Sequence, residues 1–151
     1  MTKSEKMVAL TGAVRGAFNR LKALGDALHG DLEITTAMRA VMETLAEAGA
    51  MTVPQIAKLK GVTRQHVQLL ADALVAAGLA AVKDNPAHRR SSLIALTEKG
   101  RRAFAKMRAR EAPIVEEIAA AFDVQDMERA TAVLTRLIAA VDARLAAEAP
   151  A

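Results

Sequence analysis

The sequence predicts a mainly α-helical fold that is interrupted by one small β-hairpin. The 151-residue chain is rich in Ala, Leu, Glu, Lys and Arg, which lose little conformational freedom in a helix. The stretch from Val82 to Gly100, VKDNPAHRRSSLIALTEKG, departs from this pattern because turn-forming residues and a basic cluster separate two short apolar runs. The length fits a single domain over residues 1–151.

Composition limits the classes of protein to which the chain can belong. The absence of Cys excludes disulfides and thiolate metal sites, and three Phe without Tyr or Trp predict an aliphatic core. The N-terminus lacks the apolar core of a signal peptide, and no apolar run reaches the length of a membrane span. We therefore expect a soluble, cytoplasmic protein with no membrane partner.

The first element is predicted to be a long helix over residues 5–29, ended by Gly30. Its apolar residues recur in alternating steps of three and four, a spacing typical of a helix that packs along another helix. These residues are Met7, Leu10, Val14, Ala17, Leu21, Leu24 and Leu28.

The C-terminal segment 111–148 repeats nearly the same spacing. Its apolar residues are Ala130, Leu134, Leu137, Val141 and Leu145, and the last helix begins at an acidic turn near Asp123 and Asp126. Two apolar seams at the chain ends predict dimerisation helices; the alternative is that both seams pack within the monomer. The residues that we expect at the dimer interface are Leu10, Val14, Leu21, Leu134, Leu137 and Val141.

Two short helices joined by a glycine turn are predicted in the middle of the chain. Thr52 can cap a helix over residues 53–60 that has Pro54 in its first turn. Gly61 then breaks the helix, and Thr63 can cap the next one, which ends at Gly78. This arrangement is typical of a helix-turn-helix.

The second of these helices separates apolar from polar side chains. Its inward residues are Val67, Leu70, Ala71 and Leu74. Its outward residues are Gln65, Gln68, Leu69 and Asp72, flanked by Arg64 and His66. Arg is suited to guanine and phosphate, and Gln is suited to adenine, so this face is a candidate for reading DNA. Taken singly, each of these residues is also compatible with plain solvated surface.

Residues 79–83 and 91–96 are predicted strands, and Asp84-Asn85-Pro86 forms the turn between them. Such a short hairpin must pack on the helices, with Val82, Ile94 and Leu96 as its expected inward residues. Its tip carries His88, Arg89 and Arg90, which can reach phosphates or an adjacent minor groove. The hairpin therefore resembles a wing, and residues 34–110 form a predicted winged helix-turn-helix region.

Charge is distributed unevenly along the chain. Its net charge is +4, but residues 52–110 hold twelve basic and three acidic side chains, whereas residues 111–151 hold three basic and eight acidic ones. A basic middle segment favours a polyanionic partner, although basic helix faces also serve solvation alone.

These residues carry a family resemblance. The run TVPQIAKLKGVTRQHVQLLADALVAAGLAAVKDNPAHRRSSLIALTEKG resembles the winged helix-turn-helix of the MarR (multiple antibiotic resistance regulator) family, notably in "GL" after the recognition helix and "LT-x-x-G" after the wing. The resemblance implies a winged helix-turn-helix flanked by N- and C-terminal dimerisation helices. It also implies a homodimeric transcriptional regulator, a repressor in type, which binds double-stranded DNA at a pseudo-palindromic operator.

The resemblance places the base-contacting candidates at Arg64, Gln65 and Gln68. Many family members have Arg and then Asp at the wing tip, where this chain has Ala87 and His88. Arg89 can supply the tip contact, and Arg90 can pair with an acid such as Asp84. Members often carry a basic residue at the position of Leu69, which can contact a thymine methyl group or pack against the wing. The complete set of DNA-binding candidates is Thr63, Arg64, Gln65, His66, Gln68, His88, Arg89 and Arg90.

The family resemblance also implies a small-molecule effector, commonly an aromatic anion. Because Tyr and Trp are absent, such an effector is expected to be missing here or to differ from those typical of the family. We expect no enzyme, cofactor or metal site, since His29, His66 and His88 lack metal-ligand spacing and each suggests a solvated side chain or a DNA contact. The alternative function is a helical protein–protein interaction module that does not bind DNA.

Overall fold

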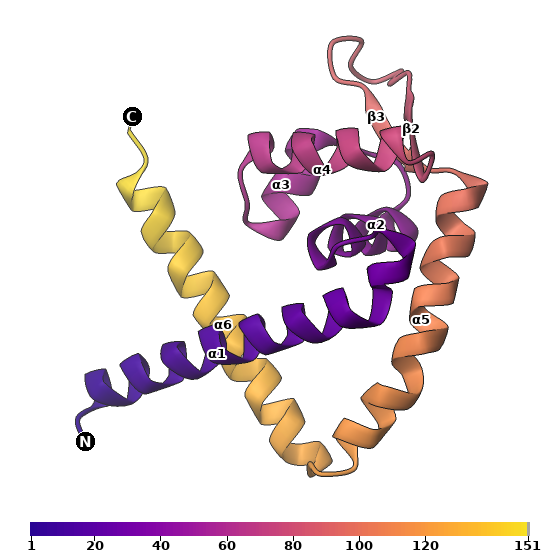
Figure 1. Ribbon diagram of the computed structural model, residues 1–151. Coiled ribbons are helices and arrows are strands. Elements are labelled where there is room, and N and C mark those ends of the chain that lie inside the picture. The colour runs from indigo at the N-terminus through magenta and orange to yellow at the C-terminus, as the bar shows by residue number, and fades with distance from the viewer. Residues whose placement is uncertain (151) are drawn as a thin grey trace. The chain divides into compact units, whose positions relative to one another are not determined.

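The computed structural model describes residues 1–150, which form helices and one small sheet (Figure 1). The elements in chain order are α1 (Lys3–His29), the 3₁₀ turn η1 (Gly30–Leu32), α2 (Thr36–Ala48), β1 (Met51–Thr52), α3 (Val53–Lys60), α4 (Arg64–Ala76), β2 (Ala80–Lys83), β3 (Leu93–Leu96), α5 (Glu98–Ala119) and α6 (Val124–Glu148). The predicted fold class, mainly α with a small β-hairpin wing, is confirmed. The chain divides into two compact units, one over Met1–Glu111 and one from Ala112 onward.

The core of the first unit lies among α2, α3, α4, the sheet and the first half of α5. Its side chains are aliphatic apart from Phe104, as the composition predicts. Helix α4 contributes Val67, Ala71 and Leu74, which are at most 1% exposed, so the predicted inward face is the buried one. The opposite face of α4 remains in solvent.

The predicted helix boundaries between β1 and β2 are confirmed by capping hydrogen bonds. The Thr52 hydroxyl accepts a hydrogen bond from the Gln55 N–H at 3.2 Å, and the Gln55 side chain accepts one from the Thr52 N–H at 2.9 Å. Gly61 ends α3 at φ 66°, a left-handed conformation that glycine adopts without strain. The Thr63 hydroxyl then accepts from the His66 N–H at 3.1 Å and starts α4.

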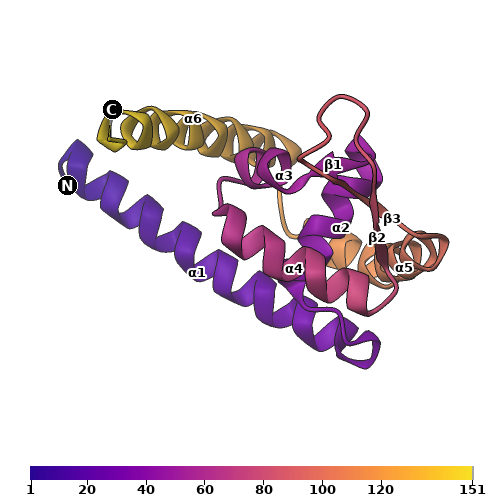
Figure 2. The ribbon, with the colours of Figure 1, turned by 90° about the horizontal axis from the view of Figure 1, so that it is seen from above.

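The sheet has three antiparallel strands in the order β1-β3-β2, and a loop projects beyond β2 and β3 (Figure 2). We call residues 80–96 the wing. The prediction contained β2 and β3 but not β1, whose Met51 pairs with Ile94. Ile94 and Leu96 are buried as expected, but the inward placement of Val82 is wrong, because that side chain is 58% exposed. The reason is strand order: β3 is central, whereas Val82 lies on the edge strand β2.

A compact set of contacts holds the base of the wing and gives physical meaning to the "GL" and "LT-x-x-G" motifs. The Thr97 hydroxyl donates to the Gly78 carbonyl at 2.6 Å and accepts from the Gly100 N–H at 3.0 Å. The Thr97 N–H donates to the Leu79 carbonyl at 3.1 Å. A Cβ atom at Gly100 would lie 1.9 Å from that carbonyl oxygen, so only glycine fits there.

An ionic cluster joins the end of α1 to α2 and α5. The Glu111 carboxylate accepts hydrogen bonds from the Arg39 guanidinium and from His29 Nε2, the latter at 2.8 Å. His29 is 1% exposed, so the expectation of a solvated or DNA-contacting histidine is wrong at this position. Arg39 also lies over the Phe104 ring, 5.5 Å from its centroid.

This cluster changes the acidity of its carboxyl group. Burial alone raises the pKa of Glu111, but the hydrogen bonds from Arg39 and His29 act in the opposite direction. Together they outweigh burial, so the pKa of Glu111 lies below its ordinary value. The carboxylate is therefore ionised at neutral pH and holds three elements of the first unit together.

The second unit contains the end of α5 and helix α6, and it holds the predicted segment 111–148 apart from Glu111. Asp123 caps α6 by accepting a hydrogen bond from the Gln125 N–H at 2.8 Å, which confirms the predicted start of the last helix. Helix α6 buries none of its residues. No helix within residues 1–150 combines the length and the apolar character needed to cross a membrane.

Candidate nucleic-acid interface

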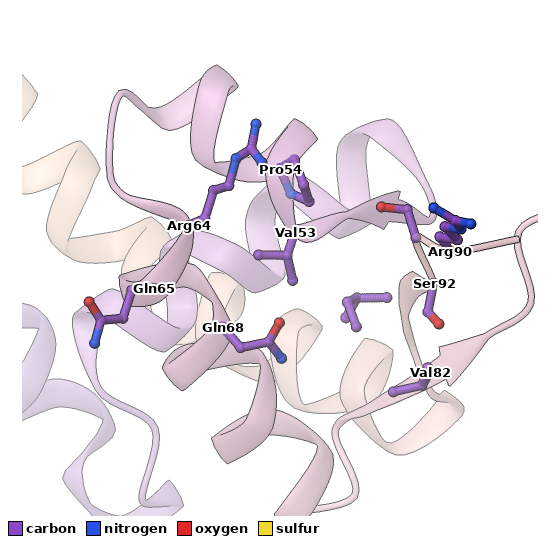
Figure 3. A pocket seen from close by; sticks show the side chains of 10 residues that line it. Val53, Pro54, Arg64, Gln65, Gln68, Val82, Arg90 and Ser92 are labelled. Carbon is purple, nitrogen blue, oxygen red and sulfur yellow. The ribbon is translucent and has the colours of Figure 1, made fainter. Parts of the chain in front are cut away.

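A groove of about 510 Å³ lies between the beginnings of α3 and α4 on one side and the wing on the other (Figure 3). It brings together four of the predicted DNA-binding residues: Arg64, Gln65, Gln68 and Arg90. The complete lining is Val53, Pro54, Arg64, Gln65, Gln68, Val82, Arg90, Ser91, Ser92 and Ile94. Polar side chains from two elements thus converge on one concave surface.

Helix α4 supplies the larger share of this surface. Arg64, Gln65 and Gln68 are exposed, whereas Val67 on the same helix is buried. His66 is exposed but does not line the groove. The oxygen of Thr63 caps the helix, and its hydroxyl hydrogen remains free to be donated to a phosphate.

The two glutamines of α4 differ in their surroundings. Gln68 Nε2 donates a hydrogen bond to Asp72 Oδ1 at 2.9 Å, one helical turn further along. The amide of Gln65 has no hydrogen-bond partner among residues 1–150. In Figure 3 the Gln68 side chain points into the groove, whereas Gln65 points away from the wing.

The tip of the wing is shaped by consecutive turns. The Asn85 side chain accepts a hydrogen bond from the Ala87 N–H at 3.1 Å, and the Asn85 carbonyl accepts one from the His88 N–H at 3.2 Å. His88, Arg89 and Arg90 are all exposed on this short frame. The wing therefore presents its basic side chains on local turns rather than on a long irregular loop.

The two arginines of the wing line different surfaces. Arg90 lines the same groove as Gln65 and Gln68 of α4. Arg89 instead lines a separate hollow together with Asp84, Asn85, Pro86 and Ser92. Within residues 1–150 neither arginine forms an ion pair, and the alternative pairing of Arg90 with Asp84 is not observed.

Leu69 lies on the same exposed face of α4. It is 65% exposed and does not contribute to the groove, so the structure does not support the alternative in which it packs against the wing. Its apolar side chain remains available to a partner on the outer side of α4.

The arrangement is suited to a double-stranded nucleic acid. A helix of this width fits the major groove, where Arg and Gln can pair with base edges, while basic side chains on a projecting wing can reach the neighbouring backbone. Within residues 1–150 no cluster of acidic, His or Cys side chains is placed to hold a metal ion.

Some features of the site were not predicted from the sequence. The role of Asp72 as the partner of Gln68 was missed, although their spacing of four residues on a helix is a signal that could have found it. The motif that contains Thr97 and Gly100 was recognised, but its contacts at the wing base were not predicted. No local signal in the sequence specified Leu79 as the backbone that approaches Gly100.

Comparison with solved structures defines the fold as that of winged helix-turn-helix regulators of the MarR type. The chain superposes on a MarR family transcription regulator with a TM-score of 0.78 and 24% identity over 97% of both chains. It also resembles the transcriptional regulator BldR from Sulfolobus solfataricus, with a TM-score of 0.79 and 19% identity over 90% of this chain and 99% of that one.

A third similar structure contains nucleic acid. A mutant of MarR from E. coli in complex with operator DNA gives a TM-score of 0.78 at 17% identity, covering 91% of this chain and 99% of that one. These three similarities establish the fold that the sequence predicted.

Similarity at the sequence level is found in mycobacteria. Uncharacterized proteins of Mycobacterium tuberculosis and Mycobacterium bovis are 43% identical to this chain over 94 residues. The matched region is 62% of this chain and 66% of those relatives, just under two thirds of their length. No family model matches the chain.

Proposed function

We propose that the protein is a transcriptional regulator that binds double-stranded DNA, with α4 as the recognition helix in the major groove and the wing on the adjacent backbone. The observation that carries this proposal is the convergence of Arg64, Gln65, Gln68 and Arg90 on one groove. The segment 52–110 contains twelve basic and three acidic residues, and this excess of positive charge favours a polyanion over an uncharged partner.

The proposal includes a homodimer. The predicted interface residues are largely uncovered in the single chain: Val14 is 37% exposed, Leu21 64% and Val141 47%. Leu134 is 37% exposed, and Leu10 and Leu137 are only partly buried. A second copy of the chain would remove this apolar surface from water, and its two-fold symmetry would match a pseudo-palindromic operator. Sedimentation that gives a monomer down to micromolar protein would contradict this part of the proposal.

We further propose that the protein acts in the cytoplasm as a repressor whose DNA affinity is lowered by a small-molecule effector. The support is comparative: the fold is shared with BpsR of Bordetella bronchiseptica, whose structure concerns regulation of DNA binding by 6-hydroxynicotinic acid. Release of DNA by an effector requires that the effector bind another conformation of the protein more tightly than the DNA-bound conformation. The test is a DNA-binding titration against a panel of small organic acids.

The decisive experiment is an electrophoretic mobility shift with genomic fragments in the presence of nonspecific competitor DNA. It identifies the operator and separates a DNA-binding regulator from a protein-docking module. Because several phosphates would be neutralised per subunit, we expect affinity to fall by orders of magnitude between about 50 and 200 mM salt. A flat salt profile would favour the protein–protein interaction module.

A further inference from the structure

The exposed face of α4 carries an acidic side chain, Asp72, close to the glutamine that faces the groove. The segment 52–110 has only three acidic residues, and of these Glu98 forms ion pairs with Arg101 and Arg102. Asp72 forms no ion pair within residues 1–150. Its observed side-chain partner is the amide of Gln68, at 2.9 Å.

A carboxylate at this place has an electrostatic disadvantage in the proposed complex. When α4 enters the major groove, Asp72 approaches two phosphate backbones without a cation to offset its charge, which opposes binding to every sequence alike. A contribution of Asp72 to DNA recognition must therefore come from its contact with Gln68 rather than from its charge.

The contact fixes the orientation of the Gln68 amide. A carboxylate accepts hydrogen bonds but does not donate them, so it attracts the NH₂ group of Gln68 and repels its carbonyl oxygen. One N–H is used by Asp72, which leaves the second N–H and the carbonyl oxygen for a base. A flip of the amide would place two acceptors against each other.

This fixed amide suits adenine and not guanine. Adenine presents an acceptor at N7 and a donor at N6, which pair with the remaining N–H and the carbonyl oxygen of Gln68. Guanine presents acceptors at both N7 and O6, so the Gln68 carbonyl would face O6 without a hydrogen. Gln65 provides an internal contrast, because the residue four positions further on is Leu69, which cannot orient an amide.

We propose that Asp72 is a positioning residue that sets the base preference of Gln68, favouring adenine over guanine. This inference rests on the proposed function, since it concerns a base that α4 reads. Asp72 does not itself contact the base; it decides which end of the Gln68 amide is presented. The same carboxylate lowers affinity for all sequences and thereby limits nonspecific binding.

The test compares variants at position 72 on the operator found by mobility shift and on copies with A·T replaced by G·C at each symmetric pair of positions. The wild type is expected to prefer adenine by about tenfold at the position read by Gln68. Asp72→Ala should lose most of that preference and bind all sequences more tightly. Asp72→Asn should do the same, because an amide at 72 can accept from or donate to either end of Gln68.

Two controls separate orientation from charge. Asp72→Glu keeps an acceptor-only anion and should restore the preference for adenine. Asp84→Ala removes an acidic residue from the wing of the same segment and should raise affinity without changing base preference. All these positions are exposed, so unchanged thermal midpoints should accompany the changes in binding.

The outcomes distinguish this inference from the function on which it rests. If the wild type binds no DNA fragment specifically, the proposed function fails and the inference fails with it. If the wild type binds an operator but Asp72→Ala and Asp72→Asn keep the full preference for adenine, the positioning role is overturned and the proposed function stands. Gln68→Ala should abolish the preference for adenine. Adding Asp72→Ala to Gln68→Ala should then cause no further change in base preference.

Discussion

The arginines of the helical framework and those of the α4–wing surface differ in their partners. In the framework, Arg39 is bound by Glu111, and Arg110 is bound by Asp31 through two hydrogen bonds of 2.6 and 2.8 Å. On the surface, Arg64, Arg89 and Arg90 have no acidic partner within residues 1–150. The same residue type therefore stabilises the fold in one region and stays available to a ligand in the other.

This difference shows that the net positive charge of a sequence segment is larger than the unpaired positive charge available to a binding partner. Part of the basic character of residues 52–110 is neutralised inside the unit, as Arg110 is by an acid from η1. Of the unpaired basic residues, Arg64 and Arg90 line the groove and Arg89 lies at the wing tip. Changes in the framework should therefore alter stability, and changes on the surface should alter DNA affinity.

The largest expected effect comes from the framework at the wing base. Gly100→Ala places a Cβ atom 1.9 Å from the Leu79 carbonyl oxygen, a backbone group that cannot move without disrupting β2. We expect a loss of unfolding free energy of about 3 kcal/mol or more, measured by urea denaturation. Gly30→Ala is the matched control, because nothing lies within 4 Å of the added carbon and φ is −58°. Equal stability of the two variants would contradict the assigned role of Gly100.

The ionic cluster gives the next largest effect. Glu111→Gln leaves Arg39 and the buried His29 without their shared anion and should lower the unfolding free energy by about 1–3 kcal/mol at pH 7. The value is below that of a fully buried pair because both Arg39 and Glu111 side chains are about one fifth exposed, at 18% and 19%. Glu98→Ala, which breaks the exposed pairs with Arg101 and Arg102, is the control and should cost less than about 1 kcal/mol.

The difference in unfolding free energy between the wild type and Glu111→Gln depends on pH with a definite sign. Because the pKa of Glu111 is lowered in the folded state, its stabilisation is complete above its unfolded pKa of about 4.3. It is lost as pH falls through the lower folded pKa. The stabilities of the wild type and Glu111→Gln should therefore converge on acidification. The Arg110 guanidinium lowers the pKa of Asp31 to about 2, so that ion pair persists until the pH is strongly acidic. A difference that persists unchanged into strong acid would contradict the stabilising role of the Glu111 carboxylate.

The elements that could be predicted from the sequence are those set by neighbours three or four residues apart. The caps at Thr52 and Thr63 are of this kind, and so are the glycine turn at Gly61 and the buried face of α4. The exposure of Val82 was predicted wrongly because it depends on the place of β2 at the edge of the sheet, which follows from the strand order and not from nearby residues.

The same limit applied to charged and polar residues. The burial of His29 depends on Glu111, 82 residues further along the chain, so no local pattern could indicate it. The candidate DNA-binding residues of α4 were found because they share one helix face. How Arg89 and Arg90 divide between two surfaces follows from the turns of the wing, which the sequence did not define.

On the α4–wing surface, glutamine and arginine variants should differ in kind. Gln65→Ala or Gln68→Ala should each relax preference at one symmetric pair of operator positions by about 1–3 kcal/mol, with little change in salt dependence. Arg89→Ala should weaken binding to all sequences alike and make the salt slope shallower by about one unit for each phosphate that is no longer neutralised. A competition assay over an operator library at two salt concentrations measures both. If Arg89→Ala changes base preference and both glutamine variants do not, the reading surface has been assigned to the wrong element.

The smallest expected effect concerns the apolar side chain among the polar residues of α4. Leu69 and Leu59 are both 65% exposed, but Leu69 shares the outward face with Gln65 and Asp72, whereas Leu59 lies on α3. If Leu69 contacts a thymine methyl group, replacing that thymine with deoxyuridine removes one buried methyl and should weaken binding by about 0.8 kcal/mol, roughly fourfold. Leu69→Ala should lose the same amount on the thymine operator and be insensitive to deoxyuridine, while Leu59→Ala should respond as the wild type does. If Leu69 contacts the thymine methyl group, the effects of Leu69→Ala and of deoxyuridine on binding will not add, because both remove the same contact. If deoxyuridine weakens binding of the wild type and of Leu69→Ala equally, Leu69 does not contact that methyl group.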